Sequence, residues 1–401
     1  MRVLLWATTL QADILALAYH LDQRRDCSLL IVTEHAEAFL QSPIARLRPI
    51  NAPLLDRNAR NVEATAVQFK ADVVVCDNHF PKFEAAPRVC AMWHGLGWKA
   101  RASTEVQAFF GNVKKLTGID PRAPNPRFLA QCYHERDFEW RTAQWGIAPE
   151  NCRVTGSCFA DLLRQPAPYS RQELQAEYGL DLSRKTVLVN ITWHYGRIFP
   201  GSWQRKLLGT AAFEEDMDFL RELIRRMRSR GVNLLFCLHD SKRYEPEYLA
   251  AMQRLLTESP DGISVRHKDH HPDNWADLSV GDVMISNLSS FSTFFYHSGR
   301  PVVHLCPPEE EGEISFAQYS WFGLHRRLRK SSMPRWMNSP NDNGGITAST
   351  AKSAFEALDT ALDDPDCCRE RSKSWLHEHL ALPQPSASEC LASELERLAR
   401  T

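Results

Sequence analysis

The segment from Asp282 to Leu305, DVMISNLSSFSTFFYHSGRPVVHL, constrains the fold more than any other part of the chain. Residues 282–286 form a short apolar run of strand length, and residues 289–297 can follow as a helix that Gly299 ends. Residues 301–305 then form the next expected strand. This order predicts two parallel strands joined by a helix, with the turn at the carboxyl edge, where open α/β sheets bind ligands.

Two adjacent serines, Ser289 and Ser290, occupy the predicted start of this helix. Their hydroxyl groups, the free backbone N–H groups of the first turn and the positive end of the helix dipole meet at one point. We therefore expect an anion there, with phosphate as the favoured ligand. The alternative is that the two serines only cap the helix.

Strand and helix patterns alternate along most of the chain, which predicts an α/β fold with parallel sheets covered on both faces. The sequence has neither a G-x-G-x-x-G pattern after the first strand nor a G-x-x-x-x-G-K-[ST] pattern, so NAD binding and ATP hydrolysis are disfavoured. Strands are expected at residues 2–6, 29–32, 72–76, 88–92, 128–132, 153–156, 186–191, 233–238 and 263–266, and helices at 12–21, 62–69, 137–145, 171–178, 214–230 and 247–256.

The chain divides into three expected parts. A proline-rich break at residues 166–169 separates a first domain, residues 1–165, from a second, residues 166–345. Residues 346–401 are expected to form amphipathic helices that pack back on the domains. Residues 102–125 have a less regular pattern, and the order weakens into a loop after Pro307 and Pro308.

Composition excludes several classes of protein. With 401 residues and a formal net charge of −1, the chain gives no sign of binding nucleic acid. It begins without a signal-peptide pattern and contains no run of about eighteen apolar residues, so a cytoplasmic location is expected. Its 11 cysteines lack C-x-x-C spacing, which indicates reduced thiols and no structural zinc.

Two clusters of charged residues have unremarkable alternatives. The segment 266–271, RHKDHH, could chelate a metal, but a solvated loop is favoured because its spacing fits no helix face. The basic segments 221–230 and 325–330 are expected to be solvated, with contact to an anionic membrane surface as the alternative. We therefore expect no metal site.

Two histidines follow predicted strands of different halves of the chain. His94 lies between a strand end and two glycines, Gly95 and Gly97, where the backbone can approach a ligand closely. An imidazole with a pKa near neutrality there suits a general base that deprotonates an acceptor hydroxyl. His239 ends the strand at residues 233–238, so it would approach a cleft between two facing sheets from the opposite side. A structural, hydrogen-bonded role is the alternative for a single histidine.

Another strand, at residues 186–191, is followed by Thr192 and Trp193. They would place a hydroxyl group and an indole at the same carboxyl edge. The alternative is that Trp193 packs at the junction between the domains.

Five motifs occur in the order and spacing found in a known family. They are Trp93-His94-Gly95 with Lys99, Val154-Thr155-Gly156 with Asp161-Leu162-Leu163, Thr192-Trp193, Leu238-His239, and the unit from Asp282 to Val303. Together they cover most of residues 71–305. In this respect the chain resembles the CDP-glycerol glycerophosphotransferases of teichoic-acid synthesis.

The resemblance implies a GT-B fold, in which two Rossmann-like domains face a central cleft, the first binding the acceptor and the second the nucleotide donor. It implies a transferase of cell-surface polysaccharide synthesis that moves a polyol-phosphate or sugar from a CDP- or UDP-linked donor to a glycan or lipid-linked acceptor. His94 and His239 would be catalytic, with His94 as the base, and no cofactor is implied. The donor site would comprise Gly95, Leu96, Gly97, Thr192, Trp193, Ser289 and Ser290, with His239 and the serines on the phosphates.

The chain departs from the family pattern at three places that bear on which group is transferred. The Pro-Arg pair of the turn is replaced by Cys158-Phe159, an Asp-Tyr pair by Asn287-Leu288, and a donor-contacting aspartate by Phe294. The alternatives are a UDP-sugar 2-epimerase-like enzyme, which would need acidic residues in the cleft, and an inactive protein that binds nucleotide sugars.

Overall fold

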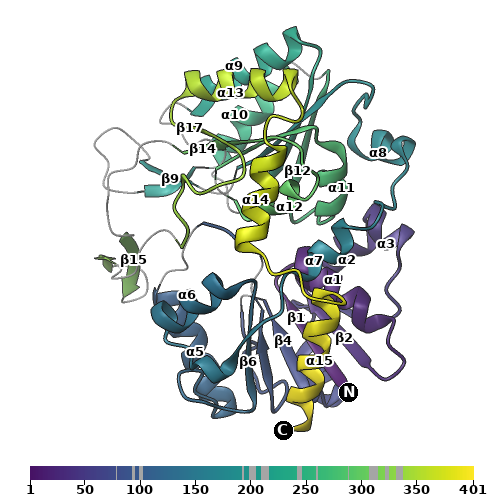
Figure 1. The fold of residues 1–401 in the computed structure, drawn as a ribbon, viewed down its shortest axis with the longest axis vertical. Coiled ribbons are helices and arrows are strands. Elements are labelled where there is room, and N and C mark those ends of the chain that lie inside the picture. Colours follow the sequence, from purple (N-terminus) through teal and green to yellow (C-terminus); the bar gives the residue numbers. More distant parts are fainter. Residues whose placement is uncertain are drawn as a thin grey trace.

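The computed structural model describes the chain in thirteen segments. These are residues 1–77, 79–92, 95–98, 103–191, 194–197, 205–208, 216–241, 246–258, 261–287, 289–306, 315–320, 325–330 and 337–401. Figure 1 shows two lobes, each built around its own sheet, with the chain passing between them more than once.

The first sheet contains seven parallel strands in the order β3-β2-β1-β4-β5-β6-β7. The strand order reverses between β1 and β4, and this reversal marks the ligand-binding edge in Rossmann-like sheets. The strands are β1 Arg2–Ala7, β2 Ser28–Thr33, β3 Leu54–Asp56, β4 Val73–Cys76, β5 Val89–Ala91, β6 Phe128–Cys132 and β7 Cys152–Val154.

The second sheet repeats this plan with six parallel strands in the order β12-β11-β8-β13-β14-β17. Its strand order reverses between β8 and β13, so the turn after β13 lies at the corresponding edge. The strands are β8 Thr186–Asn190, β11 Asn233–Leu238, β12 Ile263–His267, β13 Val283–Ser286, β14 Val302–Leu305 and β17 Ile346–Ala348.

Helices cover both sheets. Those of the first lobe are α1 Ala12–Asp22, α2 Ala36–Gln41, α3 Pro43–Leu47, α4 Val62–Phe69, α5 Ser103–Thr117, α6 Glu135–Trp145, a 3-10 turn Pro149–Asn151 and α7 Cys158–Leu163. Those of the second are α8 Arg171–Tyr178, α9 Asp216–Ser229, α10 Pro246–Thr257, α11 Asn274–Val280, α12 Phe291–Tyr296 and α13 Ala351–Asp363. Two antiparallel pairs stand apart from the sheets: β9 His194–Arg197 with β10 Arg205–Leu208, and β15 Ser315–Ser320 with β16 His325–Lys330.

Local sequence explains where these elements begin and end. Every residue of β11 is buried, as expected for a parallel strand covered on both faces. Helix α8 begins with a capping box, in which Ser170 and Glu173 each accept the other's backbone N–H, and it ends at Gly179 in the left-handed region.

The last two helices connect the lobes. Helix α14, Arg369–His379, lies between them, and α15, Ala387–Arg400, runs along the first sheet near the chain's beginning (Figure 1). The apolar face of α15, including Leu391 and Leu395, is fully buried in the same core as β1 and α1. A C-terminal helix therefore completes the N-terminal lobe.

The predicted alternation of strands and helices is confirmed, but several segments differ from the prediction. Residues 103–117 form helix α5, where an irregular segment was expected; its Val106, Phe109, Phe110 and Val113 have helical spacing and join the core of the first lobe. The segment after Pro308 contains the β15 and β16 pair as well as loop. The division at residues 165 and 345 remains a prediction.

Candidate functional site

The predicted serine pair lies at the start of α12, where the two lobes meet. Helix α12 begins at Phe291 with Ser290 as its N-cap, two residues later than expected. Ser289 is 5% exposed, and its Oγ accepts the Phe291 N–H at 3.3 Å. Its own N–H donates to the Ser286 Oγ at 3.3 Å. The Ser289 hydroxyl thus has a local structural contact, whereas Ser290 has no side-chain capping hydrogen bond.

A loop of the first lobe crosses directly over Ser290. A Cβ atom placed on Gly95 would come within 3.0 Å of both Cβ and Oγ of Ser290, and one on Gly97 within 3.3 Å of the Ser290 Cβ. Gly95 also has φ of +135°, which favours glycine. The carbonyl of Leu96 accepts the Thr293 hydroxyl at 3.4 Å. The structure therefore brings together the glycine loop and the serine turn, two of the sequence-predicted groups.

Trp98 fixes this loop in the second lobe. Its indole is fully buried and donates Nε1–H to the Asp342 carbonyl at 2.7 Å, while its own carbonyl accepts the Met337 N–H at 2.7 Å. The ring stacks on Trp375 of α14, with 5.1 Å between ring centroids, and meets Tyr296 of α12 edge to face. The sequence analysis did not single out Trp98. Its place at the end of the loop, directly after Gly97, was the only sequence feature that pointed to it.

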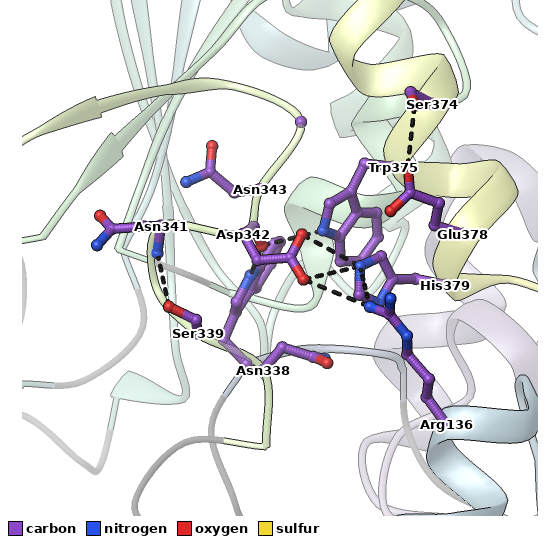
Figure 2. Close-up of polar contacts among 12 residues, drawn as sticks. Arg136, Asn338, Ser339, Asn341, Asp342, Asn343, Ser374, Trp375, Glu378 and His379 are labelled. Carbon is purple, nitrogen blue, oxygen red and sulfur yellow. Dashed lines mark hydrogen bonds and ion pairs between the residues drawn. The ribbon is translucent and has the colours of Figure 1, made fainter.

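A cavity of about 380 Å³ opens beside the loop. It is lined by residues from the glycine loop, from α6, from the segment before β17 and from α14: Leu96, Arg136, Asp137, Glu139, Met337, Asn338, Ser339, Asp342 and His379. Figure 2 shows Arg136, Asp342 and His379 directed toward one another from three separate elements. No sequence pattern indicated this group, because its members are far apart in the chain.

Charge within this group is nearly balanced. The Asp342 carboxylate lies 3.1 Å from His379 Nε2 and 3.5 Å from Arg136 NH1. Burial lowers the pKa of His379, and the neighbouring Asp342 opposes that shift. Because His379 also stacks on Trp375 at 4.3 Å, its ring is held between an indole and a carboxylate.

The two aromatic departures from the family pattern meet at the boundary between the lobes. Phe159 of α7 and Phe294 of α12 are both buried and pack edge to face, with 4.8 Å between ring centroids. The Phe294 ring also approaches Gly95, where an added Cβ would lie 3.5 Å from Cζ. An apolar pair therefore closes the space beside the glycine loop.

The other predicted site residues are less informative. His239 follows β11, two strands from β13, and its Nδ1 accepts the Asp240 N–H at 2.7 Å. His94, Thr192 and Trp193 lie outside the described residues. At the corresponding edge of the first sheet, the Asp77 carboxylate accepts hydrogen bonds from the Thr8 N–H at 3.0 Å and from the Thr8 hydroxyl at 2.9 Å. The sequence analysis missed this contact, although Asp77 directly follows a strand.

Two absences concern the described part of the chain. Within it, no three His, Cys, Asp or Glu side chains gather closely enough to hold a metal ion. No helix there combines the length and the apolarity needed to cross a membrane. All 11 cysteines are free thiols.

The chain has the GT-B fold. This fold consists of two Rossmann-like domains that meet at their ligand-binding edges, with a C-terminal helix that returns to the first domain. Several solved structures are similar to the chain at low sequence identity. The wall teichoic acid polymerase TagF, in a variant soaked with CDPG, matches with a TM-score of 0.66 and 10% identity over 100% of this chain and 88% of that one. No protein-family model and no curated protein sequence matches.

Two further matches extend over almost all of both chains. The UDP-GlcNAc 2-epimerase from Neisseria meningitidis, bound to UDP-GlcNAc, has a TM-score of 0.56, 14% identity and coverage of 99% of this chain and 100% of its own. S. aureus MnaA with UDP has a TM-score of 0.54, 15% identity and coverage of 98% and 95%. The predicted fold class is thereby confirmed.

Proposed function

We propose that this protein is a GT-B transferase that moves a polyol-phosphate or a sugar from a CDP- or UDP-linked donor to a glycan or lipid-linked acceptor. The observation that carries the proposal is the contact of the Gly95–Gly97 loop with Ser290, at the carboxyl edge of the second sheet. Backbone groups of one domain and a helix start of the other meet there, and both favour an anion. The teichoic-acid family likeness and the three nucleotide-soaked or nucleotide-bound fold neighbours support it.

In the proposed reaction, His94 accepts the proton of the acceptor hydroxyl, whose oxygen attacks the transferred group of the donor. The bond to the nucleotide breaks, and the nucleotide leaves with its phosphate charge stabilised by the Ser290 hydroxyl and the start of α12. His239 would contact the donor phosphates from the end of β11, and Thr192 and Trp193 would line the donor site. We propose a cytoplasmic location with peripheral contact at the inner face of the membrane, in cell-surface polysaccharide synthesis.

The serine turn provides a test of donor binding. Replacing Ser290 together with Ser289 by alanine should weaken the affinity for the nucleotide diphosphate at least tenfold, because a hydrogen bond to a charged group contributes about 1.5–3 kcal/mol. Ser290→Ala alone should account for most of the loss, since the Ser289 Oγ already accepts the Phe291 N–H. Calorimetric titration measures both affinities.

A matched control is Ser298→Ala, at the opposite end of α12, where Oγ donates to the Phe295 carbonyl. It should leave nucleotide affinity unchanged. If the double variant binds as tightly as the wild type, the serines are helix caps only.

The donor itself is expected to differ from CDP-glycerol. The aspartate and the arginine of the family pattern can form hydrogen bonds with the hydroxyl groups of glycerol. In this chain Phe294 and Phe159 replace them, and their packed rings offer apolar surface only. The test is a turnover assay in which CDP-glycerol, CDP-ribitol and common UDP-sugars compete, and in which the release of CMP, UMP or UDP is measured. We expect a donor other than CDP-glycerol to be preferred. Clear preference for CDP-glycerol would contradict this prediction. A donor at about a hundred times its Kd should raise stability by about 2.7 kcal/mol, so the melting temperature provides a first screen.

A UDP-sugar 2-epimerase-like activity is the second candidate, favoured by the match to the N. meningitidis epimerase. Conversion of a UDP-sugar without any acceptor would identify it. Tight nucleotide binding without turnover of any donor would instead identify an inactive nucleotide-sugar-binding protein.

A further inference from the structure

The cavity beside the glycine loop has a chemical character distinct from that of the serine turn. Leu96 of the glycine loop lines it, and its other walls come from α6, from the segment 337–342 and from α14. Its volume of about 380 Å³ is within the range of small-molecule sites, roughly 300–1,000 Å³. The cavity is therefore large enough for a single sugar ring or a short polyol.

We propose that this cavity binds a neutral polyhydroxyl group, the terminal sugar or polyol of the acceptor. This assignment rests on the proposed transferase function.

The walls supply hydrogen-bond donors and acceptors in a mixed set. Arg136 donates only, the carboxylates of Glu139 and Asp342 accept only, and the Ser339 hydroxyl does both. A sugar hydroxyl also donates and accepts, so it can use both kinds of partner at once. Leu96 and Met337 add apolar surface for the C–H groups of a ring.

Charge argues against a phosphate in this place. Arg136 lies 3.5 Å from the Asp342 carboxylate, which balances its positive charge. Glu139 is exposed, and its carboxylate forms no hydrogen bond or ion pair with another described residue. Its carboxylate adds negative charge at the cavity, which would repel a phosphate, whereas a hydroxyl group can donate a hydrogen bond to it.

The position of the cavity fits an acceptor. Leu96 lines it, and the neighbouring Gly95 and Gly97 lie on Ser290, the proposed phosphate contact. His94, the proposed base, precedes this loop in the sequence by one residue. A polyol held in the cavity would therefore have a hydroxyl group within reach of the same short loop that covers the donor site.

The test is saturation-transfer NMR on the full-length protein with glycerol, ribitol and methyl N-acetyl-β-glucosaminide, and with glycerol 3-phosphate as the anionic counterpart. We expect at least one neutral compound to bind more tightly than the phosphate. Glu139→Ala should weaken that binding about tenfold, the effect of losing one hydrogen bond to a charged group. Ser339→Trp should abolish it, because an indole would occupy the cavity.

Glu135→Ala is the matched control, since Glu135 is exposed on the same helix and does not line the cavity. It should bind the neutral compounds as the wild type does. Preference for glycerol 3-phosphate, or neutral binding unchanged in both Glu139→Ala and Ser339→Trp, would overturn the proposal. Nucleotide binding is measured separately by melting temperature. Its absence would refute the transferase function, whereas its presence without polyol binding would refute only the acceptor site.

Discussion

Replacing His94 with alanine should lower turnover by about two to four orders of magnitude, which is the usual contribution of a positioned general acid or base. The prediction follows from its place in the sequence, between the end of β5 and the glycine loop, and from the family likeness. Met92, which directly follows that strand, is buried, and its N–H donates to the Cys76 carbonyl at 2.7 Å. Gly95 on the other side lies on Ser290. The described residues before and after His94 are thus held against the first sheet and against the start of α12.

Donor affinity should change little in His94→Ala, because the role proposed for the imidazole is to accept the proton of the acceptor hydroxyl. The measurement is nucleotide release under saturating donor, paired with calorimetric titration of the donor. The control is His377→Ala, an exposed histidine of α14, which should retain the wild-type rate. Turnover of His94→Ala near the wild-type level would remove the general-base role.

The sequence predicted the parallel sheets well because their strands are continuous apolar runs. Residues 233–238 were predicted as a strand and form β11 with the same bounds. Helix α5 was missed because Gly111 and several polar residues interrupt its pattern, although its four buried Val and Phe residues have helical spacing. The strand β17 has only three residues, too few for a periodic signal.

The candidate site was predictable where its residues are close in the sequence. The glycine loop and the serine turn each have a local signal, a flexible backbone in one and capping hydroxyls in the other. Their contact, and that of Phe159 with Phe294, depend on how the two domains pack. The hydrogen bond from Trp98 to Asp342 joins residues 244 positions apart, so no spacing rule could indicate it. The polar cavity beside the loop was missed for the same reason.

This long-range contact leads to the second large expected effect. Trp98→Ala should lower the free energy of unfolding by about 3–5 kcal/mol, because it removes a fully buried indole and leaves a cavity among Trp375 and Tyr296. Such a loss is a large part of the roughly 5–15 kcal/mol that stabilises a typical protein. Denaturant unfolding measures it. The control is Leu40→Ala, an apolar side chain that is 58% exposed, which should change stability by no more than about 0.5 kcal/mol.

Trp98→Phe separates the packing of the ring from the hydrogen bond of its Nε1–H. It should fold even if the alanine variant fails to fold. A phenyl ring keeps most of the stacking on Trp375 but cannot donate to the Asp342 carbonyl. That carbonyl still accepts Trp375 Nε1–H at 3.0 Å, so it is not left without a partner. We therefore expect a smaller loss in the free energy of unfolding, about 1–2 kcal/mol, for one hydrogen bond and part of a ring.

Because Trp98 fixes the loop that covers Ser290, donor affinity should fall in Trp98→Phe as well. If stability falls while donor affinity and turnover stay at wild-type values, the indole holds the domains together without positioning the loop.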